Sequence, residues 1–199
     1  GCMKIITGSG PSFFIRTDYL SLVNPENLMA GAEFDEPYES DILDAGLAFA
    51  AEKKAVDYLS RAEQSRSGLF KKLLAKDFPE ASIVKALDYL EKISYLSDLR
   101  FARAWLNSRK INHSEGRSKL YGELLSRGIS RENASAALDE FFENNDEMLL
   151  CMKAMQKYRR LKKSPEKMIN CLMRAGFSKG MIKLAVKNEG ELLEADAQV

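Results

Sequence analysis

A dense run of basic residues near the C-terminal end is the part of the sequence best suited to binding a charged partner. Five of the seven residues from Lys157 to Lys163 are lysine or arginine, within the stretch QKYRRLKKSPEKM at 156–168. Such a run can hold nucleic-acid phosphates, can dock on an acidic groove of a protein, or can keep a helix solvated. The surrounding segment, 153–187, carries eleven basic residues and one acid, Glu166. A solvated face does not need a net charge of +10, so we interpret this segment as facing a partner, either protein or phosphate.

The rest of the chain carries no comparable excess of positive charge. The net charge is −6 over residues 1–51, +1 over 52–152 and −4 over 188–199, and the whole chain sums to +1. With 45% hydrophobic and 30% charged residues, the chain has the composition of a globular protein with a real core. No apolar run approaches the roughly 18 residues of a transmembrane helix, and the N-terminus lacks the layout of a signal peptide. We therefore predict a cytoplasmic protein without membrane contact, whose natural chain begins at Met3.

Few side chains are arranged for catalysis or metal binding. The three cysteines have no metal-type spacing, and Cys151 and Cys171 lie among apolar residues at helical spacing, which indicates reduced core thiols. His113 is the only histidine and lies in the polar stretch INHSEG. Phosphate-binding glycine loops, the HExxH motif and the GxSxG motif are absent from the sequence. We predict a protein that is not an enzyme and that has no catalytic residues, no cofactor and no metal site.

Two aromatic residues could stack on nucleic-acid bases but are better explained by packing. Trp105 and Phe101 are separated by four positions and share one face of a predicted helix, as core residues do. Tyr158 stands within the basic run KYRR, where base stacking is an alternative to helix packing.

The chain from about Leu47 repeats a helical unit three times. Three apolar residues, 51 and 48 residues apart, mark equivalent turns: Phe78, Ile129 and Phe177. Each follows a residue suited to the left-handed conformation that ends a helix, namely Asp77, Gly128 or Gly176. Each precedes a residue that suits the start of the next helix, namely Pro79, Ser130 or Ser178. A further amphipathic helix comes before each pair, so every unit is predicted to hold three helices.

These patterns predict a mainly α protein with five successive segments. Residues 1–46 form an N-terminal segment with one or two short strands, because SFFIRTDYLSLV mixes aromatic and β-branched residues after the turn-prone TGSGP. Residues 47–96, 97–145 and 146–190 are three helix-turn-helix-like repeats, here called repeats 1, 2 and 3. Residues 191–199 form an acidic, flexible tail. The second helices of the pairs offer mostly acids and alanines, apart from SKGMIKLAVKN, so reading of the DNA major groove is not favoured.

Several blocks in one order give the chain a strong resemblance to the RecX family, which regulates the bacterial RecA recombinase. The stretch YLSDLRFARAWLNSR, Tyr95 to Arg109, resembles the family's pattern of Tyr–Leu, an acid, Phe–Ala, an aromatic and a terminal arginine. GRSKLYGELLSRGI, Gly116 to Ile129, resembles a second block, and KYRRLKKSPEKMINCLMRAGFS resembles a third. The blocks YLSRAEQSR and LFKKLLAKDF of repeat 1 also fit, with Asp77 in place of the usual glycine. The resemblance covers residues 48–188.

The resemblance implies three tandem three-helix repeats that form an elongated curved rod. It also implies a monomeric, non-catalytic regulator, most often an inhibitor, that lies along the groove of the RecA–DNA filament. Such a protein modulates strand exchange, ATPase and co-protease activity in DNA recombination, repair and the SOS response. The partners are then RecA and single- or double-stranded DNA within the filament, and the alternative is a helical repeat protein that binds nucleic acid without RecA. The candidate contact residues are Lys157, Arg159, Arg160, Lys162, Lys163, Lys167, Arg109, Lys110, Arg117 and Lys119.

Overall fold

The three turns expected from the repeat pattern form through residues in the left-handed conformation. Asp77 has a φ of 61°, Gly128 of 80° and Gly176 of 92°. In repeats 2 and 3 the following serine caps the next helix. The Ser130 hydroxyl accepts a hydrogen bond from the N–H of Asn133 at 3.2 Å, and the Ser178 hydroxyl accepts one from Met181 at 3.1 Å. The sequence predictions of helix end, turn and helix start are confirmed at these positions.

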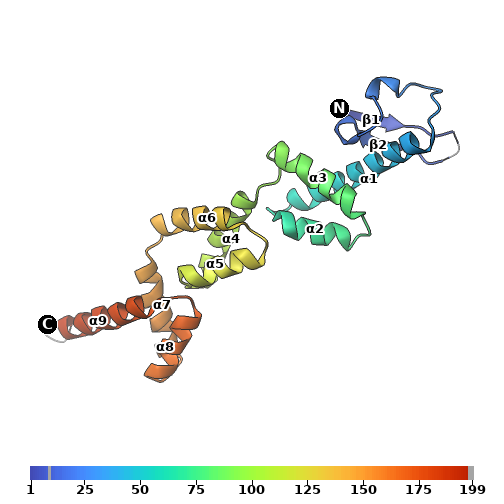
Figure 1. The fold of residues 1–199 in the computed structure, drawn as a ribbon. Helices are drawn as coiled ribbons and strands as arrows, with labels where there is room; N and C mark the ends of the chain where they lie inside the picture. The colour runs from blue at the N-terminus through green and yellow to red at the C-terminus, as the bar shows by residue number, and fades with distance from the viewer. Residues whose placement is uncertain (9, 197–199) are drawn as a thin grey trace. The chain divides into compact units, whose positions relative to one another are not determined.

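The computed structural model describes residues 1–8 and 10–196, of which 189–196 are described by their backbone alone. The chain folds as two units, Gly1–Ser97 and Asp98–Val199 (Figure 1). The first unit contains strands β1 (Cys2–Ile5) and β2 (Phe13–Arg16), the 3-10 helices η1 (Thr17–Tyr19) and η2 (Pro25–Asn27), and helices α1 (Glu36–Leu59), α2 (Arg66–Leu74) and α3 (Glu80–Lys92). The second contains α4 (Asp98–Asn112), α5 (Arg117–Ser126), α6 (Arg131–Glu143), α7 (Glu147–Arg160), α8 (Pro165–Arg174) and α9 (Lys179–Asp196). The mainly helical fold with two short N-terminal strands confirms the predicted fold class; the curved-rod arrangement of the repeats stays a prediction.

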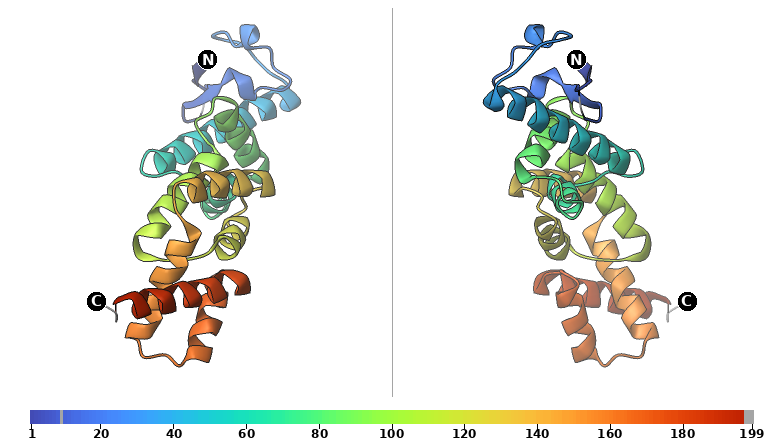
Figure 2. Two further views of the ribbon diagram at one scale, coloured as in Figure 1. Left: turned by 90° about the vertical axis from the view of Figure 1, so that its left-hand side faces the viewer. Right: turned by 90° about the vertical axis from the view of Figure 1, so that its right-hand side faces the viewer.

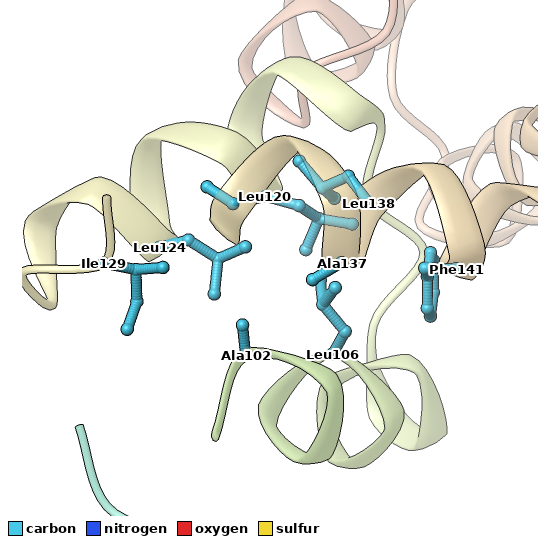
Figure 3. Packing of buried hydrophobic residues seen from close by; sticks show 9 residues of the cluster. Ala102, Leu106, Leu120, Leu124, Ile129, Ala137, Leu138 and Phe141 are labelled. Carbon is cyan, nitrogen blue, oxygen red and sulfur yellow. The ribbon is translucent and has the colours of Figure 1, made fainter. Parts of the chain in front are cut away.

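Each group of three helices surrounds its own apolar core. In repeat 2, α4 contributes Ala102 and Leu106, which face Leu124 of α5 and Leu138 of α6 (Figure 3). In repeat 3, α7, α8 and α9 lie together in all three views, around a core that includes Leu172 (Figures 1 and 2). These side chains recur every three or four residues along each helix, so burial of one apolar stripe per helix stabilises each bundle.

The N-terminal strands form an antiparallel hairpin that packs on α1. Ile15 is fully buried against Ala45 and Ala48 of that helix. The helix start expected near Leu47 is corrected to Glu36, so the predicted limit at residue 46 lies inside α1. Gly46 does not interrupt the helix. A β-carbon there would lie 2.7 Å from the Phe13 ring, so glycine gives β2 room to approach.

A polar network fixes this hairpin to helix α1. Arg16 Nε donates to Glu52 Oε2 at 2.8 Å, and Arg16 Nη2 pairs with the other carboxylate oxygen. The Tyr19 hydroxyl also donates to Glu52 Oε2, at 2.7 Å. The Arg16 guanidinium lies 4.1 Å from the centre of the Tyr89 ring, on α3. The network therefore ties β2 and η1 to both long helices of the first unit.

The C-terminal helix is longer than the sequence pattern indicated. Helix α9 continues to Asp196, so the backbone of residues 191–196, expected to be a flexible acidic tail, is helical. Residues 197–199 of that expected tail lie outside the described residues. Across the described residues, the helices are all too short or too polar to cross a membrane.

Candidate partner-binding surface

Helix α7 separates its apolar and basic side chains onto opposite faces. Cys151, Ala154 and Met155 are buried in the core of repeat 3. Lys153, Lys157 and Arg160 are exposed and follow one another at spacings of four and three residues, so they form one stripe along the helix. The helix begins at its N-cap Asp146, whose carboxylate accepts a hydrogen bond from the Met148 N–H at 2.7 Å. The acids at the N-terminal end of α7 and the basic residues in its last turn both interact favourably with the helix dipole, which is positive at the N-terminus and negative at the C-terminus.

The loop between α7 and α8 extends the basic stripe. Lys162 adopts a φ of 52°, which turns the chain after the last helical residue. Lys163 lies over the Tyr158 ring, with Nζ 4.9 Å from its centre, and its Nζ contacts Cys171 Sγ at 3.0 Å. Helix α8 then begins with Ser164 as its N-cap residue and Pro165 in the first turn, and the Ser164 side chain makes no capping hydrogen bond with the described residues. Tyr158 itself packs partly buried on the core of repeat 3, which agrees with helix packing.

Helix α9 adds a second basic stripe that sequence reasoning did not single out. Lys179, Lys183 and Lys187 are exposed and recur every fourth residue, on the side of the helix away from buried Ile182 and Ala185. Their spacing of four residues predicts one face of a helix, but the three lysines do not form a contiguous basic run in the sequence. Lys153 and Arg174 were missed for the same reason.

Within the part of the chain that the structure describes, most of the basic side chains in repeat 3 have no acidic partner. Among the described residues, no ion pair within 4.0 Å involves any of the following exposed cations: Lys153, Lys157, Arg160, Lys162, Lys167, Arg174, Lys179 and Lys183. Arg159 makes an interaction of its own and does not belong to this set. We call these eight residues the open cations. Since none of the described carboxylates pairs with them, their positive potential is available to an anionic partner.

In repeat 2, three of the four candidate residues are instead paired with carboxylates. Arg109 Nε and Lys119 Nζ each lie 2.7 Å from the carboxylate of Glu115, which is only 6% exposed. Burial alone would raise the pKa of this carboxyl, but the hydrogen bonds from Arg109 and Lys119 outweigh it and lower the pKa from 4.5 to about 2. The carboxylate therefore stays charged and ties the linker to α4 and α5.

Arg117 has a similar structural role at the start of α5. Its guanidinium pairs with Asp139 on α6 and lies 5.8 Å from the centre of the Phe142 ring. Its backbone N–H donates to the Glu147 carboxylate at 2.8 Å, which links α5 to the first residue of α7. Lys110 is the one candidate of repeat 2 that is exposed without a partner among the described residues. Apart from Lys110, the ten candidates thus divide into a paired set in repeat 2 and an exposed set, mostly open cations, in repeat 3.

Repeats 2 and 3 meet through a backbone contact that positions the open cations. The Gly116 N–H donates to the carbonyl oxygen of Ala175 at 2.8 Å. Next to this contact is a cleft of about 390 Å³, lined by residues of both repeats that include Tyr121, Glu147 and Ser178. Because Glu115 and Arg117 flank Gly116, the ion pairs of repeat 2 hold the linker against repeat 3.

The chemistry of this surface is electrostatic. The Cys151 thiol is fully buried, and burial with the nearby Glu147 charge raises its pKa to about 11, so it stays protonated at neutral pH. In the part of the chain that the structure describes, no group of three His, Cys, Asp or Glu residues could hold a metal ion. Trp105 packs on the core of repeat 2, with the guanidinium of Arg127 4.5 Å from the ring centre. The exposed lysines and arginines give this face its positive charge.

The comparisons with known proteins agree with this arrangement. A family model described as the RecX second three-helix domain matches residues 97–138, and one described as the RecX first three-helix domain matches residues 51–90. Regulatory protein RecX of Treponema pallidum (strain Nichols) is 37% identical, over 78% of this chain and 96% of its own length. Regulatory protein RecX of Clostridioides difficile (strain 630) is 29% identical, over 79% of this chain and 73% of its own.

Solved structures show the same fold. The crystal structure of a regulatory protein RecX superposes with a TM-score of 0.71 at 25% identity and covers 80% of this chain and 81% of that chain. The structure of RecX from Lactobacillus salivarius has a TM-score of 0.62 at 20% identity, over 71% of this chain and 96% of that one. The blocks quoted from the sequence, the three-helix repeats and the named relatives agree, and the chain belongs to the RecX family of regulatory proteins.

Proposed function

We propose that this protein inhibits the RecA recombinase by binding along the groove of the RecA–DNA filament. It acts by occupying the groove, without catalysing a reaction, and thereby restrains strand exchange, ATP hydrolysis and co-protease activity. It works in the bacterial cytoplasm as a monomer, in DNA recombination, repair and the SOS response.

The observation that carries this proposal is the set of open cations in repeat 3. A filament of protein and DNA presents phosphates and acidic side chains along its length, and exposed cations without partners attract both. In repeat 2, by contrast, Glu115 and Asp139 neutralise Arg109, Lys119 and Arg117, so these cations support the fold more than they add positive charge to the surface. We therefore place the main electrostatic contact in repeat 3, with Lys110 as an addition from repeat 2.

The proposal is tested with the DNA-dependent ATPase and strand-exchange reactions of RecA. Added wild-type protein should lower both rates. The triple variant Lys157→Glu, Arg160→Glu and Lys162→Glu should need about tenfold more protein for the same inhibition, because three attractive contacts become repulsive. The matched control reverses Lys71, Lys76 and Lys92, three exposed lysines of repeat 1, and should inhibit like the wild type. Rates that do not respond to the wild-type protein would refute the proposal.

A second function, binding of nucleic acid without RecA, is also favoured by the open cations. It predicts tight binding to DNA alone at physiological salt, which the triple variant abolishes. If the triple variant loses RecA inhibition but keeps its binding to free DNA, the first function is supported over the second.

A further inference from the structure

The N-terminal part of the first unit has a surface whose charge is opposite to that of repeat 3. Residues 1–51 contain eight acidic and two basic residues. One of the two basic residues, Arg16, forms an ion pair with Glu52. Asp41 is also used internally, because its carboxylate accepts hydrogen bonds from the N–H groups of Ser21, Leu22 and Val23. Six other carboxylates are exposed, and none of them forms an ion pair among the described residues: Glu26, Glu33, Asp35, Glu36, Glu39 and Asp44.

An apolar groove of about 860 Å³ lies among these acids. It runs between the end of β1 and the loop at residues 28–34, with α1 as its base. Its walls include side chains that are unusually exposed for apolar residues, namely Ile6 at 77%, Met29 at 71% and Leu43 at 49%. Glu33 and Glu39 stand on its rim. Exposed apolar surface bordered by polar groups is typical of a site that binds another molecule.

The groove also borders an unpaired strand edge. The sheet has only two strands, so one edge of β1 has no neighbour in the described residues. The register pairs Lys4 with Phe14, and the Thr17 N–H donates to the Gly1 carbonyl at 3.0 Å. Gly1 and Thr17 are therefore a hydrogen-bonded pair, and such pairs alternate with non-hydrogen-bonded pairs along an antiparallel ladder. Lys4 and Phe14 form a non-hydrogen-bonded pair, so the N–H and C=O of Lys4 point away from β2. Lys4 and Ile5 both line the groove, so an extended chain there could pair with β1.

We propose that this groove binds an extended, basic segment of a protein partner, which adds to β1 as a third strand. Its backbone hydrogen-bonds to the free edge at Lys4, and alternate apolar side chains enter the space between Ile6, Met29 and Leu43. Its lysine or arginine side chains lie against Glu33 and Glu39. The acidic rim repels nucleic acid, so the ligand is a peptide. The proposal stands independently of the function assigned to repeat 3.

The test uses the full chain and a fluorescein-labelled peptide of about ten residues that alternates valine and lysine, an extended pattern with one apolar face. Anisotropy should report binding, whereas a valine–glutamate peptide of equal length should not bind. Methylation of the peptide's backbone nitrogens should weaken binding about tenfold, because the strand hydrogen bonds are lost. Hydrogen exchange of the Lys4 amide should slow when the peptide is present.

Paired charge reversals locate the site. The variant Glu33→Lys with Glu39→Lys should raise the peptide Kd by about tenfold, because both rim carboxylates become repulsive. The control variant is Glu36→Lys with Asp44→Lys, which changes the net charge by the same amount as the rim variant. Like the rim variant, it reverses one carboxylate in the first turn of α1. Neither Glu36 nor Asp44 lines the groove. It should raise the Kd less than threefold. Equal loss in both variants, or binding that survives backbone methylation, would overturn the proposal. The proposal would also be overturned if the wild-type chain formed a dimer that dissociates in the rim variant, because a second copy of the chain would then occupy the groove.

Discussion

A β-carbon built on Gly116 would lie 2.5 Å from the carbonyl oxygen of Gly176, so the backbones of repeats 2 and 3 touch directly at this point. Gly176 is equally restricted, because a β-carbon there would lie 2.5 Å from the backbone nitrogen of Lys119 and its φ is 92°. The contact combines with the hydrogen bond from the Gly116 N–H to Ala175. Two glycines thus set the distance between the paired charges of repeat 2 and the open cations of repeat 3.

Replacing Gly116 with alanine should lower the free energy of unfolding of the second unit. The new methyl group meets backbone atoms that cannot rotate away, and we expect a loss of about 1–3 kcal/mol. The single tryptophan, Trp105, packs on the core of repeat 2, so urea unfolding can be followed by its fluorescence.

The control for this substitution is Gly122→Ala, in the following helix α5. Among the described residues, no atom lies within 4 Å of a β-carbon at Gly122. Alanine should therefore stabilise the helix, by about 0.5–1 kcal/mol. Two variants that change stability by the same amount would contradict the close contact at Gly116.

Glu115 should make the second unit sensitive to acid. Its folded pKa of about 2 is lower than the ordinary 4.5, so the folded state holds this proton less tightly than the unfolded state. The stabilisation is complete above pH 4.5 and is lost as the pH falls toward 2. Glu115→Gln should cost about 1–3 kcal/mol at pH 7 and should flatten the decline in unfolding free energy below pH 4.5.

The matched control for acid sensitivity is Glu143→Gln, an exposed carboxylate at the end of α6. It should leave both the stability at pH 7 and its decline in acid unchanged. A Glu115→Gln variant with the same acid profile as the wild type would show that the pair with Arg109 and Lys119 does not form.

The Arg16–Glu52 pair should stabilise the first unit more than a surface ion pair does. Its side chains are 18% and 8% exposed, so Arg16→Met leaves a buried carboxylate without its cation. We expect a loss of about 3 kcal/mol in urea unfolding followed by circular dichroism. Asp57→Asn removes the exposed pair with Lys54 and should cost less than about 0.5 kcal/mol. Similar losses in the two variants would contradict the role of the network.

The cysteines should differ in reactivity toward iodoacetamide at pH 8. Cys2 is exposed and should be alkylated within minutes. Cys151 is buried, with its pKa raised to about 11, so it holds little thiolate and should react only when repeat 3 opens. Mass spectrometry of the labelled peptides measures both rates. Rapid labelling of Cys151 in the folded protein would contradict its place in the core.

The local rules of helix ends made the repeats predictable from the sequence. Gly128, Gly176 and Asp77 stood where a left-handed residue was required, and the structure confirms all three. The start of α1 was not predictable in this way. Pro37 and Gly46 look like interruptions, but Pro37 lies in the first turn and Gly46 is explained by the Phe13 ring, which comes from a distant strand.

The partition of charge among the candidate residues depends on tertiary contacts. Arg117 pairs with Asp139 on another helix, and only the fold brings these residues together. The basic run at 157–163 could be recognised because no acids stand near it, whereas the lysines of α9 are dispersed by helical spacing. Sequence reasoning therefore identified where positive charge is concentrated but not which cations are already paired.

The most direct test of the central claim is the affinity of the protein for a preformed RecA–DNA filament, measured by anisotropy at about 50 and 200 mM salt. The wild-type protein should bind with a Kd that rises by at least about tenfold between the two salt concentrations, because several open cations displace counterions. The variant with glutamate at Lys157, Arg160 and Lys162 should bind more weakly and with a smaller salt dependence, whereas the Lys71, Lys76 and Lys92 reversal should match the wild type. Equal affinity and equal salt dependence for the wild type and the repeat 3 variant would contradict the claim that the open cations contact the filament.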